Sequence, residues 1–487
     1  MSKRYLLLIV VALIAGLVAS CAQPAPTATP RPTVAPTKAA GAQPTAAVAE
    51  PGGEFMAQLR KDGYIGPPLT TENITIHMLD VKPNELTEAM YDRWIAEFEA
   101  AFPNINIEPE RIPFGDMAAK IQVIVAGGSP PDLMAADGPY TKAYCFYDIL
   151  EPLNPYVSAE YLADYVPATL EEQSCDGQVY AWPQQQATLT GYFNRDMFVK
   201  AGLDAPPETT DVAKGWTWEK FMEAWKKLTV RAADGSTTIW GLAPATFSSG
   251  GPGSNYYMEG VFIRGKGDAS APKDSDEYKT WAAISEDGTD VKGYLDSNGA
   301  IEGMKFYQSI IQVEKVSPTA AIPNCFADER AATGFHTGAA GANYMKINPN
   351  LPMGVTPMPH YEGRAPFSHG GSNSMAVAKG SKHKPEAMAF ALYIYNYKNR
   401  VEYAQVTKNL PALLSVFEGT GQYGEYPNTL LREALINVAV PRPGGPGYSH
   451  YESVANLAIK DIGLGADVAS RLHQAAEQLN GLLTVFK

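Results

Sequence analysis

The chain has 487 residues with a formal net charge of −13 at pH 7, and its 45% hydrophobic content is typical of a soluble globular protein. The excess of 52 acidic over 39 basic residues leaves no basic stripe, which argues against a nucleic-acid partner. The length exceeds what one hydrophobic core usually supports, so we expect the folded part to form two lobes.

The first 21 residues carry the features of an export signal. Basic residues at positions 3 and 4 precede an apolar run from Tyr5 to Val18, and two small residues then precede Cys21. The run is too short for a membrane span and ends in small residues, as a signal peptide does. Residues 18–21 resemble a bacterial lipobox, which implies cleavage before Cys21 and its acylation. An ordinary cleaved signal with an incidental cysteine is the alternative.

Residues 22–51 are almost entirely Pro, Thr and Ala, a composition that cannot bury a core. We expect an extended tether, which at roughly 3 Å per residue would reach up to about 90 Å. We assign residues 1–20 to the signal peptide, residues 21–70 to the lipidated cysteine and tether, and the folded part to residues 71–487. The expected location is outside the cytoplasm, lipid-anchored on the outer face of the cell membrane or in the periplasm.

Strand and helix patterns alternate through the folded part. Alternation of period two marks strands, and apolar residues that recur every three or four positions mark helices. In chain order they predict a strand at 74–79, a helix at 86–102 that Pro103 ends, a strand at 105–107, a helix at 117–125, a strand at 132–134, and later helices at 217–228, 385–394 and 468–483. This order predicts a parallel sheet covered by helices, with ligand-binding loops at the carboxyl ends of the strands.

Three cysteines follow Cys21, at positions 145, 175 and 325. An odd number in an oxidising compartment suggests one disulfide and one thiol. We favour Cys145 with Cys175, because a bridge that closes a loop of about thirty residues is undemanding and stabilises by roughly 3 to 4 kcal/mol. Cys325 stays open as a partner. The cysteines lack CxxC spacing and have no histidine nearby in sequence, so we expect no zinc site.

Several segments in a fixed order resemble one known family. The chain resembles the extracellular solute-binding proteins of ABC importers, specifically the sugar-binding branch that includes maltose-binding protein. The segments that carry the resemblance are Phe98–Ile105, Ala126–Leu133, Gly177–Pro183, Gly191–Phe198 with Ala201–Leu203, Gly370–Val377 and Asn409–Ala412. The sequence departs from the family pattern at 326–335 and at about 250–290, which leaves the identity of the ligand open.

The resemblance implies an α/β, two-lobed type II periplasmic-binding-protein fold. Each lobe is then a mainly parallel sheet covered by helices, with the ligand cleft between the lobes. We expect residues 71–183 and 370–412 in the N-terminal lobe, and residues 184–369 and 413–487 in the C-terminal lobe. The implied crossings lie near 182–186, 367–371 and 410–414.

The resemblance also implies function. A monomer would capture a carbohydrate or related small solute by lobe closure, without a cofactor or metal, and deliver it to the transmembrane subunits of an ABC permease with a cytoplasmic ATPase. A monosaccharide, oligosaccharide, polyol, glycerol phosphodiester or short peptide would each be compatible.

Sugars need paired donors and acceptors for their hydroxyls, and aromatic rings for their apolar faces. Residues of these types, or glycines that allow close backbone approach, occur where the family places its cleft. The candidate ligand-binding residues are Asp80, Asp137, Trp182, Gln185, Gln186, Asn255, Tyr256, His369, Gly370, Gly371 and Ser372. A plain surface is the alternative for the glutamines, and a flexible loop is the alternative for the residues around Asn255.

Two other classes compete with a binding protein. An exported glycosidase would need two positioned carboxylates, which 52 acidic residues cannot exclude. The sequence contains no GxSxG, HExxH or Walker A motif. A lipoprotein that binds another polypeptide would be favoured by a helical repeat or an extended apolar patch, and the sequence shows neither.

Overall fold

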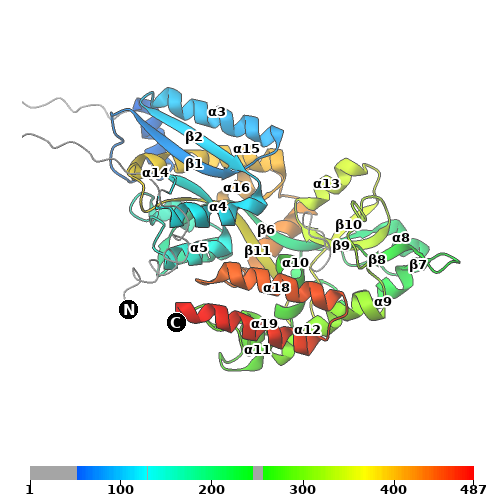
Figure 1. Cartoon of the computed structure of the whole chain (residues 1–487). Coiled ribbons are helices and arrows are strands. Elements are labelled where there is room, and N and C mark those ends of the chain that lie inside the picture. Colours follow the sequence, from blue (N-terminus) through cyan, green and yellow to red (C-terminus); the bar gives the residue numbers. More distant parts are fainter. Residues whose placement is uncertain (1–51, 129, 245–255) are drawn as a thin grey trace, which may run out of the picture.

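The computed structural model describes residues 52–128, 130–244 and 256–487. These residues form two lobes (Figure 1), with the N-terminal lobe at the upper left of the view and the C-terminal lobe at the lower right. The chain enters each lobe more than once, so segments that are far apart in the sequence pack side by side in the same lobe. None of the helices within the described ranges is long and apolar enough to cross a bilayer.

The N-terminal lobe begins with α2 and closes with α16. Its elements are α2 (Gly53–Lys61), β1 (Ile74–Val81), α3 (Glu85–Ala101), β2 (Ile105–Ile112), α4 (Phe114–Ala126), β3 (Leu133–Asp137), α5 (Gly138–Phe146), α6 (Ala159–Ala163), α7 (Pro167–Glu172), β4 (Ser174–Cys175), β5 (Gln178–Val179), α14 (Lys384–Ile394), α15 (Tyr397–Thr407), β12 (Leu410–Pro411) and α16 (Leu414–Gly419).

The C-terminal lobe holds the middle of the chain and its final helices. Its elements are α8 (Arg195–Lys200), η2 (Val212–Lys214), α9 (Trp218–Leu228), β7 (Val230–Arg231), β8 (Thr237–Leu242), α10 (Tyr256–Arg264), α11 (Asp276–Ala282), α12 (Asn298–Gln308), η3 (Ser309–Val313), β9 (Ala331–Thr337), α13 (Ala340–Ile347), β10 (Met353–Thr356), α17 (Asn428–Asn437), β13 (Ala439–Val440), α18 (Tyr448–Gly463), α19 (Val468–Leu483) and η4 (Thr484–Phe486).

Two long strands, β6 (Ala181–Asn194) and β11 (Ser368–Val377), connect the lobes. The strand order of the main sheet is β2-β1-β3-β11-β6-β9-β8-β7, so one twisted sheet runs through both lobes. The expected parallel pairing holds for β1 with β2 and β3, and for β8 with β9. The connecting strands pair antiparallel with each other, β11 also with β3 and β6 also with β9, whereas β13 pairs parallel with β11.

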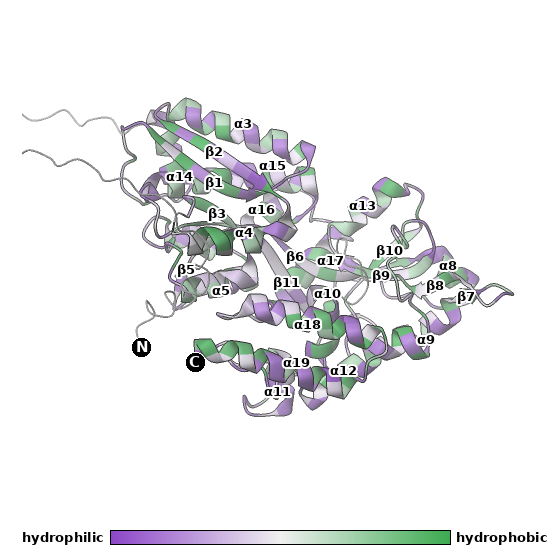
Figure 2. Cartoon of the chain, in the orientation of Figure 1, coloured by the Kyte–Doolittle hydropathy of each residue, from purple (hydrophilic) through white to green (hydrophobic). Residues whose placement is uncertain are grey.

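Each lobe has its own hydrophobic core. The core of the N-terminal lobe includes Trp94 and Phe98 of α3 together with Phe390 of α14, and that of the C-terminal lobe includes Trp218 and Trp225 of α9. Helices such as α3 and α18 carry both hydrophilic and hydrophobic residues along their length (Figure 2). Their apolar side therefore packs on the sheet or on a neighbouring helix, while the polar side faces solvent.

The folded part begins earlier than the composition predicts. Residues 53–70, which the sequence analysis places in the tether, form α2 and an extended segment, and Met56, Leu59, Tyr64 and Leu69 are buried in the N-terminal core. These side chains are large enough to bury apolar surface, unlike the Pro, Thr and Ala before them. The second segment of the N-terminal lobe, expected to end at residue 412, also extends further, because Val416 of α16 packs in the same N-terminal core.

Cys145 and Cys175 form the disulfide that the spacing favours, with Cα atoms 6.5 Å apart. The bond links the end of α5 to β4. Cys325 is a buried free thiol in the C-terminal lobe, and burial raises its pKa to about 11. A thiol with so high a pKa is present almost entirely in the unreactive protonated form at neutral pH.

Candidate functional site: the cleft between the lobes

A cleft of about 1010 Å³ opens between the two lobes. The described residues that line it come from the carboxyl ends of β1 and β3, the start of α3, helices α4 and α5, the connecting strands, α15 and its flanking residues, and α13 and α18 of the C-terminal lobe. The carboxyl ends of parallel strands meet at this edge of the sheet, which explains why loops with polar side chains gather there.

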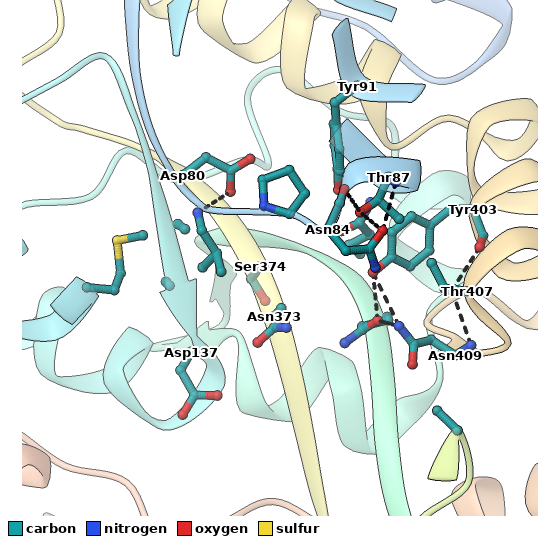
Figure 3. Close-up of a pocket in the computed structure, with 18 of the residues that line it drawn as sticks. Asp80, Asn84, Thr87, Tyr91, Asp137, Asn373, Ser374, Tyr403, Thr407 and Asn409 are labelled. Atoms are coloured by element: carbon teal, nitrogen blue, oxygen red, sulfur yellow. Dashed lines mark hydrogen bonds between the residues drawn. The ribbon is translucent and has the colours of Figure 1, made fainter. Parts of the chain in front are cut away.

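One wall of the cleft is built by β1 and α3. Asp80 lies at the carboxyl end of β1, and Asn84 then caps α3 by accepting hydrogen bonds from the backbone N–H groups of Leu86 and Thr87, each at 3.1 Å. Such a cap satisfies two of the free donors at a helix start. Tyr91, one helical turn beyond Thr87, also lines the cleft. Figure 3 shows these residues along the upper side of the cleft.

The Asp80 carboxyl group is half-buried. Its Oδ1 accepts a hydrogen bond from the Val81 backbone N–H at 2.7 Å. Burial raises the pKa of Asp80 to about 6, although that hydrogen bond and the charge of Arg111 lower it in part. A pKa raised by burial means that the surroundings stabilise the charged form of the carboxyl group less than water does.

The floor of the cleft comes from the two connecting strands. Gln184 and Gln185 of β6 lie beside Asn373 and Ser374 of β11, at an irregularity in the ladder. Gln185 pairs with Asn373 and Pro183 with Ser374, which leaves Gln184 as an additional residue in β6. This β-bulge changes which side chains point to the cleft.

A buried arginine fixes the backbone of this floor. Arg400 of α15 donates from Nη1 to the carbonyl oxygens of Pro183 and Gln184, the latter at 2.9 Å, and from Nη2 to the Tyr165 hydroxyl at 2.7 Å. The guanidinium fork can hold several acceptors at once in one geometry. The segment that carries Gln185 is therefore held rigidly against the N-terminal lobe.

Gln185 belongs to a side-chain triad with Tyr403 and Asn409. The Tyr403 hydroxyl donates to Gln185 Oε1 at 2.9 Å, and Asn409 Nδ2 donates to the same oxygen. Asn409 Nδ2 also lies 3.3 Å from the Tyr403 hydroxyl. Tyr403 and Asn409 lie side by side on one side of the cleft, away from Asp80 and Asp137 (Figure 3).

The opposite side of the cleft is formed by the C-terminal lobe. Asn343 and Lys346 project from α13 and are exposed, and Glu452 projects from α18. Burial raises the pKa of Glu452, whose carboxyl group accepts hydrogen bonds from Tyr140 at 3.0 Å and Tyr448 at 3.3 Å. Tyr140 is on α5 of the N-terminal lobe, so this contact spans the two lobes.

A buried ion pair joins the lobes beside that contact. Arg442, in the loop before α18, donates from Nη2 to Asp137 Oδ1 at 2.6 Å, and the two side chains are 7% and 14% exposed. Asp137 is the last residue of β3 and lines the cleft. The ion pair therefore ties the N-terminal sheet to the C-terminal lobe and neutralises one carboxylate of the cleft.

The structure brings three of the predicted site residues into this cleft: Asp80, Asp137 and Gln185. Two other calls, Asn255 and the lipidation site Cys21, lie outside the described residues. The remaining candidates are Trp182, Gln186, Tyr256, His369, Gly370, Gly371 and Ser372, and none of them is among the described residues that line the cleft.

Trp182 requires the clearest correction. Its side chain is fully buried and packs in the core of the N-terminal lobe, near Met375 on the paired strand. An aromatic side chain at a crossing strand can serve either the core or a ligand, and this one points into the lobe. Tyr256 is likewise buried, with its ring packed edge-on to Tyr451 in the C-terminal core.

The candidates on β11 lie behind the cleft floor. Gly370 and Gly371 pair with Thr188 and Ala187 of β6 in the ladder, so this backbone is engaged within the sheet. A Cβ atom on Gly371 would lie 3.0 Å from the Tyr257 ring, which gives close packing as the reason for glycine. His369 is buried and hydrogen-bonds through Nδ1 to the Tyr257 carbonyl oxygen at 3.0 Å. Burial lowers its pKa well below the ordinary value.

Ser372 and Gln186 belong to a buried polar cluster around Glu172 of α7. The Ser372 hydroxyl donates to Glu172 Oε2 at 2.6 Å, and Gln173 Nε2 donates to the Ser372 hydroxyl at 2.7 Å. Burial raises the pKa of Glu172 to about 7, partly offset by the charge of Arg442. The cluster supports the floor from behind.

Sequence reasoning missed Tyr403 and Asn409. Tyr403 lies in the second half of α15. Asn409 follows Lys408, whose left-handed backbone conformation (φ 61°) ends the helix. Asn409 begins a segment that resembles the solute-binding family, and this was the signal that could have drawn attention to it. Their proximity to Gln185 is a tertiary contact across more than two hundred residues, which local patterns do not report.

The comparisons with known proteins agree with the two-lobed fold. The family model described as bacterial extracellular solute-binding protein matches residues 83–401. The chain belongs to this family. The resemblance stated from the sequence is thereby confirmed, and members of the family are binding proteins rather than enzymes.

Individual relatives are distant but cover most of the chain. A galactooligosaccharide-binding protein of Bacillus subtilis is 22% identical over 396 residues, covering 80% of this chain and 85% of the relative. A putative binding protein of Brucella abortus is 24% identical over 401 residues, covering 79% and 88%. A solute-binding protein of an ABC transporter from Thermotoga lettingae, bound with α-D-tagatose, matches with a TM-score of 0.66 at 20% identity, covering 84% of this chain and 99% of that one. This likeness confirms the two-lobed fold.

Proposed function

We propose that this extracellular solute-binding protein captures a neutral carbohydrate in the cleft and delivers it to an ABC permease. The observation that carries the proposal is the composition of the cleft wall, where the Asp80 carboxyl, the side-chain amides of Gln184, Gln185 and Asn373, and five tyrosines converge. These groups can pair with sugar hydroxyls and pack against sugar C–H faces. The galactooligosaccharide-binding relative supports a carbohydrate as the ligand.

The size of the cleft favours an oligosaccharide over a monosaccharide. Pockets for drug-sized ligands span about 300 to 1,000 Å³, and this cleft of about 1010 Å³ lies at the upper end. Closure of the lobes would reduce the volume, yet the lining still extends from α3 to α18. A ligand of two or more sugar units could contact both walls at once.

The charges of the cleft favour a neutral ligand. Among the described lining residues, the acidic side chains are Asp80, Glu85, Asp137 and Glu452, and the basic ones are Lys346 and Lys408. Phosphate recognition usually depends on arginine forks or free helix N-termini. The described lining residues include no arginine, and the α3 N-terminus that reaches the cleft is already capped by Asn84. An acidic ligand such as a sugar phosphate would instead meet unfavourable Coulomb energy near Asp80.

A thermal-shift panel tests this proposal. Maltotriose, raffinose and a galactooligosaccharide mixture are compared with sn-glycerol 3-phosphate and glucuronate. A neutral sugar at 100 times its Kd should stabilise the fold by about 2.7 kcal/mol, while the acidic compounds should cause no shift. Stabilisation only by the acidic compounds would contradict the proposal. Release of free sugar from the bound oligosaccharide would instead favour the glycosidase.

We also propose that the protein is held as a monomer at the outer face of the membrane by an acylated Cys21. The lipobox resemblance and the Pro/Thr/Ala-rich segment that follows it support this proposal. Cys21→Ala should shift the protein from the membrane to the soluble fraction, measured by fractionation and by metabolic labelling with a fatty acid. Unchanged acylation in the variant would contradict it.

A further inference from the structure

The triad of Gln185, Tyr403 and Asn409 assigns an orientation to the Gln185 side chain. A carboxamide has one oxygen that accepts hydrogen bonds and one nitrogen with two N–H donors. Here the oxygen accepts from the Tyr403 hydroxyl at 2.9 Å and from Asn409 Nδ2. Both donors approach the same oxygen, so that the nitrogen end of the amide is the part left for other partners.

The partners of Gln185 are themselves held in place. The Asn409 backbone N–H donates to the Thr407 hydroxyl at 3.2 Å, and its carbonyl accepts from the Tyr423 hydroxyl at 3.0 Å. The next residues of the chain form β12, in which Leu410 pairs with Gln186 and Pro411 pairs with Gln185. Backbone pairing therefore sets Asn409 beside Gln185, and helix α15 sets Tyr403 there from the other side.

The position of Gln185 makes this orientation useful. The residue lines the cleft and is half-buried, and it lies on a strand whose carbonyl groups are fixed by Arg400. In the view of Figure 3, Asp80 lies on one side of Asn373 and Ser374, and Tyr403 and Asn409, which contact Gln185, lie on the other. One side of the cleft thus presents a carboxylate acceptor and the other presents amide donors.

We propose that Gln185 is a specificity-determining residue that donates N–H hydrogen bonds to the ligand, and that Tyr403 and Asn409 are positioning residues that hold its amide in that orientation. The inference rests on the proposed carbohydrate-binding function. It requires a ligand that accepts hydrogen bonds at Gln185 and donates one at Asp80, which a chain of sugar hydroxyls and ring oxygens does.

The matched change is Gln185→Glu, which keeps the shape and the oxygen that Tyr403 and Asn409 contact. The variant replaces the two N–H donors with a second acceptor. Because maltotriose and raffinose are neutral, the added charge does not repel them by itself. We expect the affinity for whichever of these two probes the wild type binds to fall by about tenfold, as for the loss of one well-placed hydrogen bond, with an unchanged thermal midpoint.

Two further variants separate positioning from structure. Tyr403→Phe removes one donor to Gln185 Oε1 and should weaken binding of the same probe severalfold in isothermal titration calorimetry, because the amide can then rotate. Tyr156→Phe is the control. The Tyr156 hydroxyl donates to Glu151 Oε1 at 3.4 Å, and neither residue lines the cleft, so this variant should bind the probe as the wild type does. Wild-type affinity in Gln185→Glu would overturn the proposal, because it would mean that an oxygen already faces the ligand.

A ligand-free measurement keeps the inference distinct from the proposed function. If the wild type binds no compound of the panel, the proposed function fails, and the orientation of the amide is still decided by NMR. The Gln185 side-chain N–H₂ resonances, assigned by their loss in Gln185→Glu, should exchange rapidly with water in the unliganded protein. Slow exchange would place the nitrogen inside the triad and would overturn the inference.

Discussion

At the end of β1, the Asp80 carboxyl group accepts one backbone N–H and otherwise faces the cleft. Its folded-state pKa of about 6 lies above the ordinary value of 3.8, so the folded protein binds this proton more tightly than the unfolded chain does. The stabilising effect of the proton is complete below pH 3.8 and is lost as the pH rises through about 6. At neutral pH the charged Asp80 therefore lowers the stability of the fold.

Asp80→Asn should thus raise the thermal midpoint of the unliganded protein at pH 7.5, raise it less at pH 5, and have little effect only near pH 3.8 and below. The same change should weaken the binding of a neutral oligosaccharide by about tenfold or more, because a charged acceptor is lost. Differential scanning fluorimetry and calorimetry measure the two effects. Asp204→Asn, at an exposed loop position, is the control. A lower midpoint with unchanged affinity would assign Asp80 a structural role instead.

Protonation of Glu172, in the buried cluster with Ser372, stabilises the fold in the same way as protonation of Asp80. The Glu172 pKa of about 7, raised by burial from 4.5, means that the protonated form stabilises the fold and that this contribution is lost as the pH rises through 7. The wild type should lose about 2 kcal/mol from this group between pH 5.5 and pH 8.5, and Glu172→Gln should remove that part of the pH dependence. Urea unfolding at several pH values measures it, with exposed Glu171→Gln as the control. A parallel pH dependence in wild type and variant would show that Glu172 is charged throughout.

At the scale of single elements, the connecting strand β6 carries both core and cleft residues within four positions. Trp182 packs in the N-terminal core, whereas Gln185 lines the cleft. Positions an odd number apart lie on opposite faces of a strand, so alternation by itself separates these two side chains. The bulge at Gln184 lies between them and interrupts the regular pairing with β11.

This placement changes the expected effect of a substitution at Trp182. Trp182→Ala should destabilise the fold by about 3 to 5 kcal/mol, as a large-to-small change in a core does. The protein that remains folded at low temperature should bind the ligand with nearly wild-type affinity. Chemical denaturation and calorimetry at 10 °C test both parts. Normal stability combined with lost affinity would return Trp182 to the binding site.

The elements with strong local patterns were predictable from the sequence. The strand at 74–79, the helix at 86–102 and the helices at 217–228 and 468–483 all appear with bounds shifted by at most two residues. Asp80 was accessible to prediction because it follows such a strand. Tyr403 and Asn409 were not, because their role depends on β12 pairing with β6, a contact between distant segments. Helix α2 was missed because residues 53–61 directly follow the Pro-rich stretch and were assigned to the same tether.

At the scale of the whole molecule, the Asp137–Arg442 ion pair is a joint between the lobes. Removing one partner of a buried pair leaves an uncompensated charge, so Arg442→Gln should cost about 3 kcal/mol of stability. Asp137→Asn combined with Arg442→Gln should recover part of that loss, which a double-mutant cycle in urea measures. Additive losses in the double variant would show that the two side chains do not interact in solution.

The cleft is lined unequally by the two lobes, and this inequality has a kinetic consequence. All of the described lining residues belong to the N-terminal lobe or to the connecting strands except Ala339, Ala342, Asn343, Lys346 and Glu452. A ligand can therefore bind to most of its contact surface on the N-terminal lobe before the lobes close. Contacts with the C-terminal lobe then determine the dissociation rate. Asn343→Ala with Lys346→Ala, on exposed positions of α13, should shorten the residence time of the bound oligosaccharide while the association rate constant stays within about twofold. Stopped-flow tyrosine and tryptophan fluorescence resolves the two rates. Slower association with unchanged residence would instead mean that both lobes take part in the first encounter.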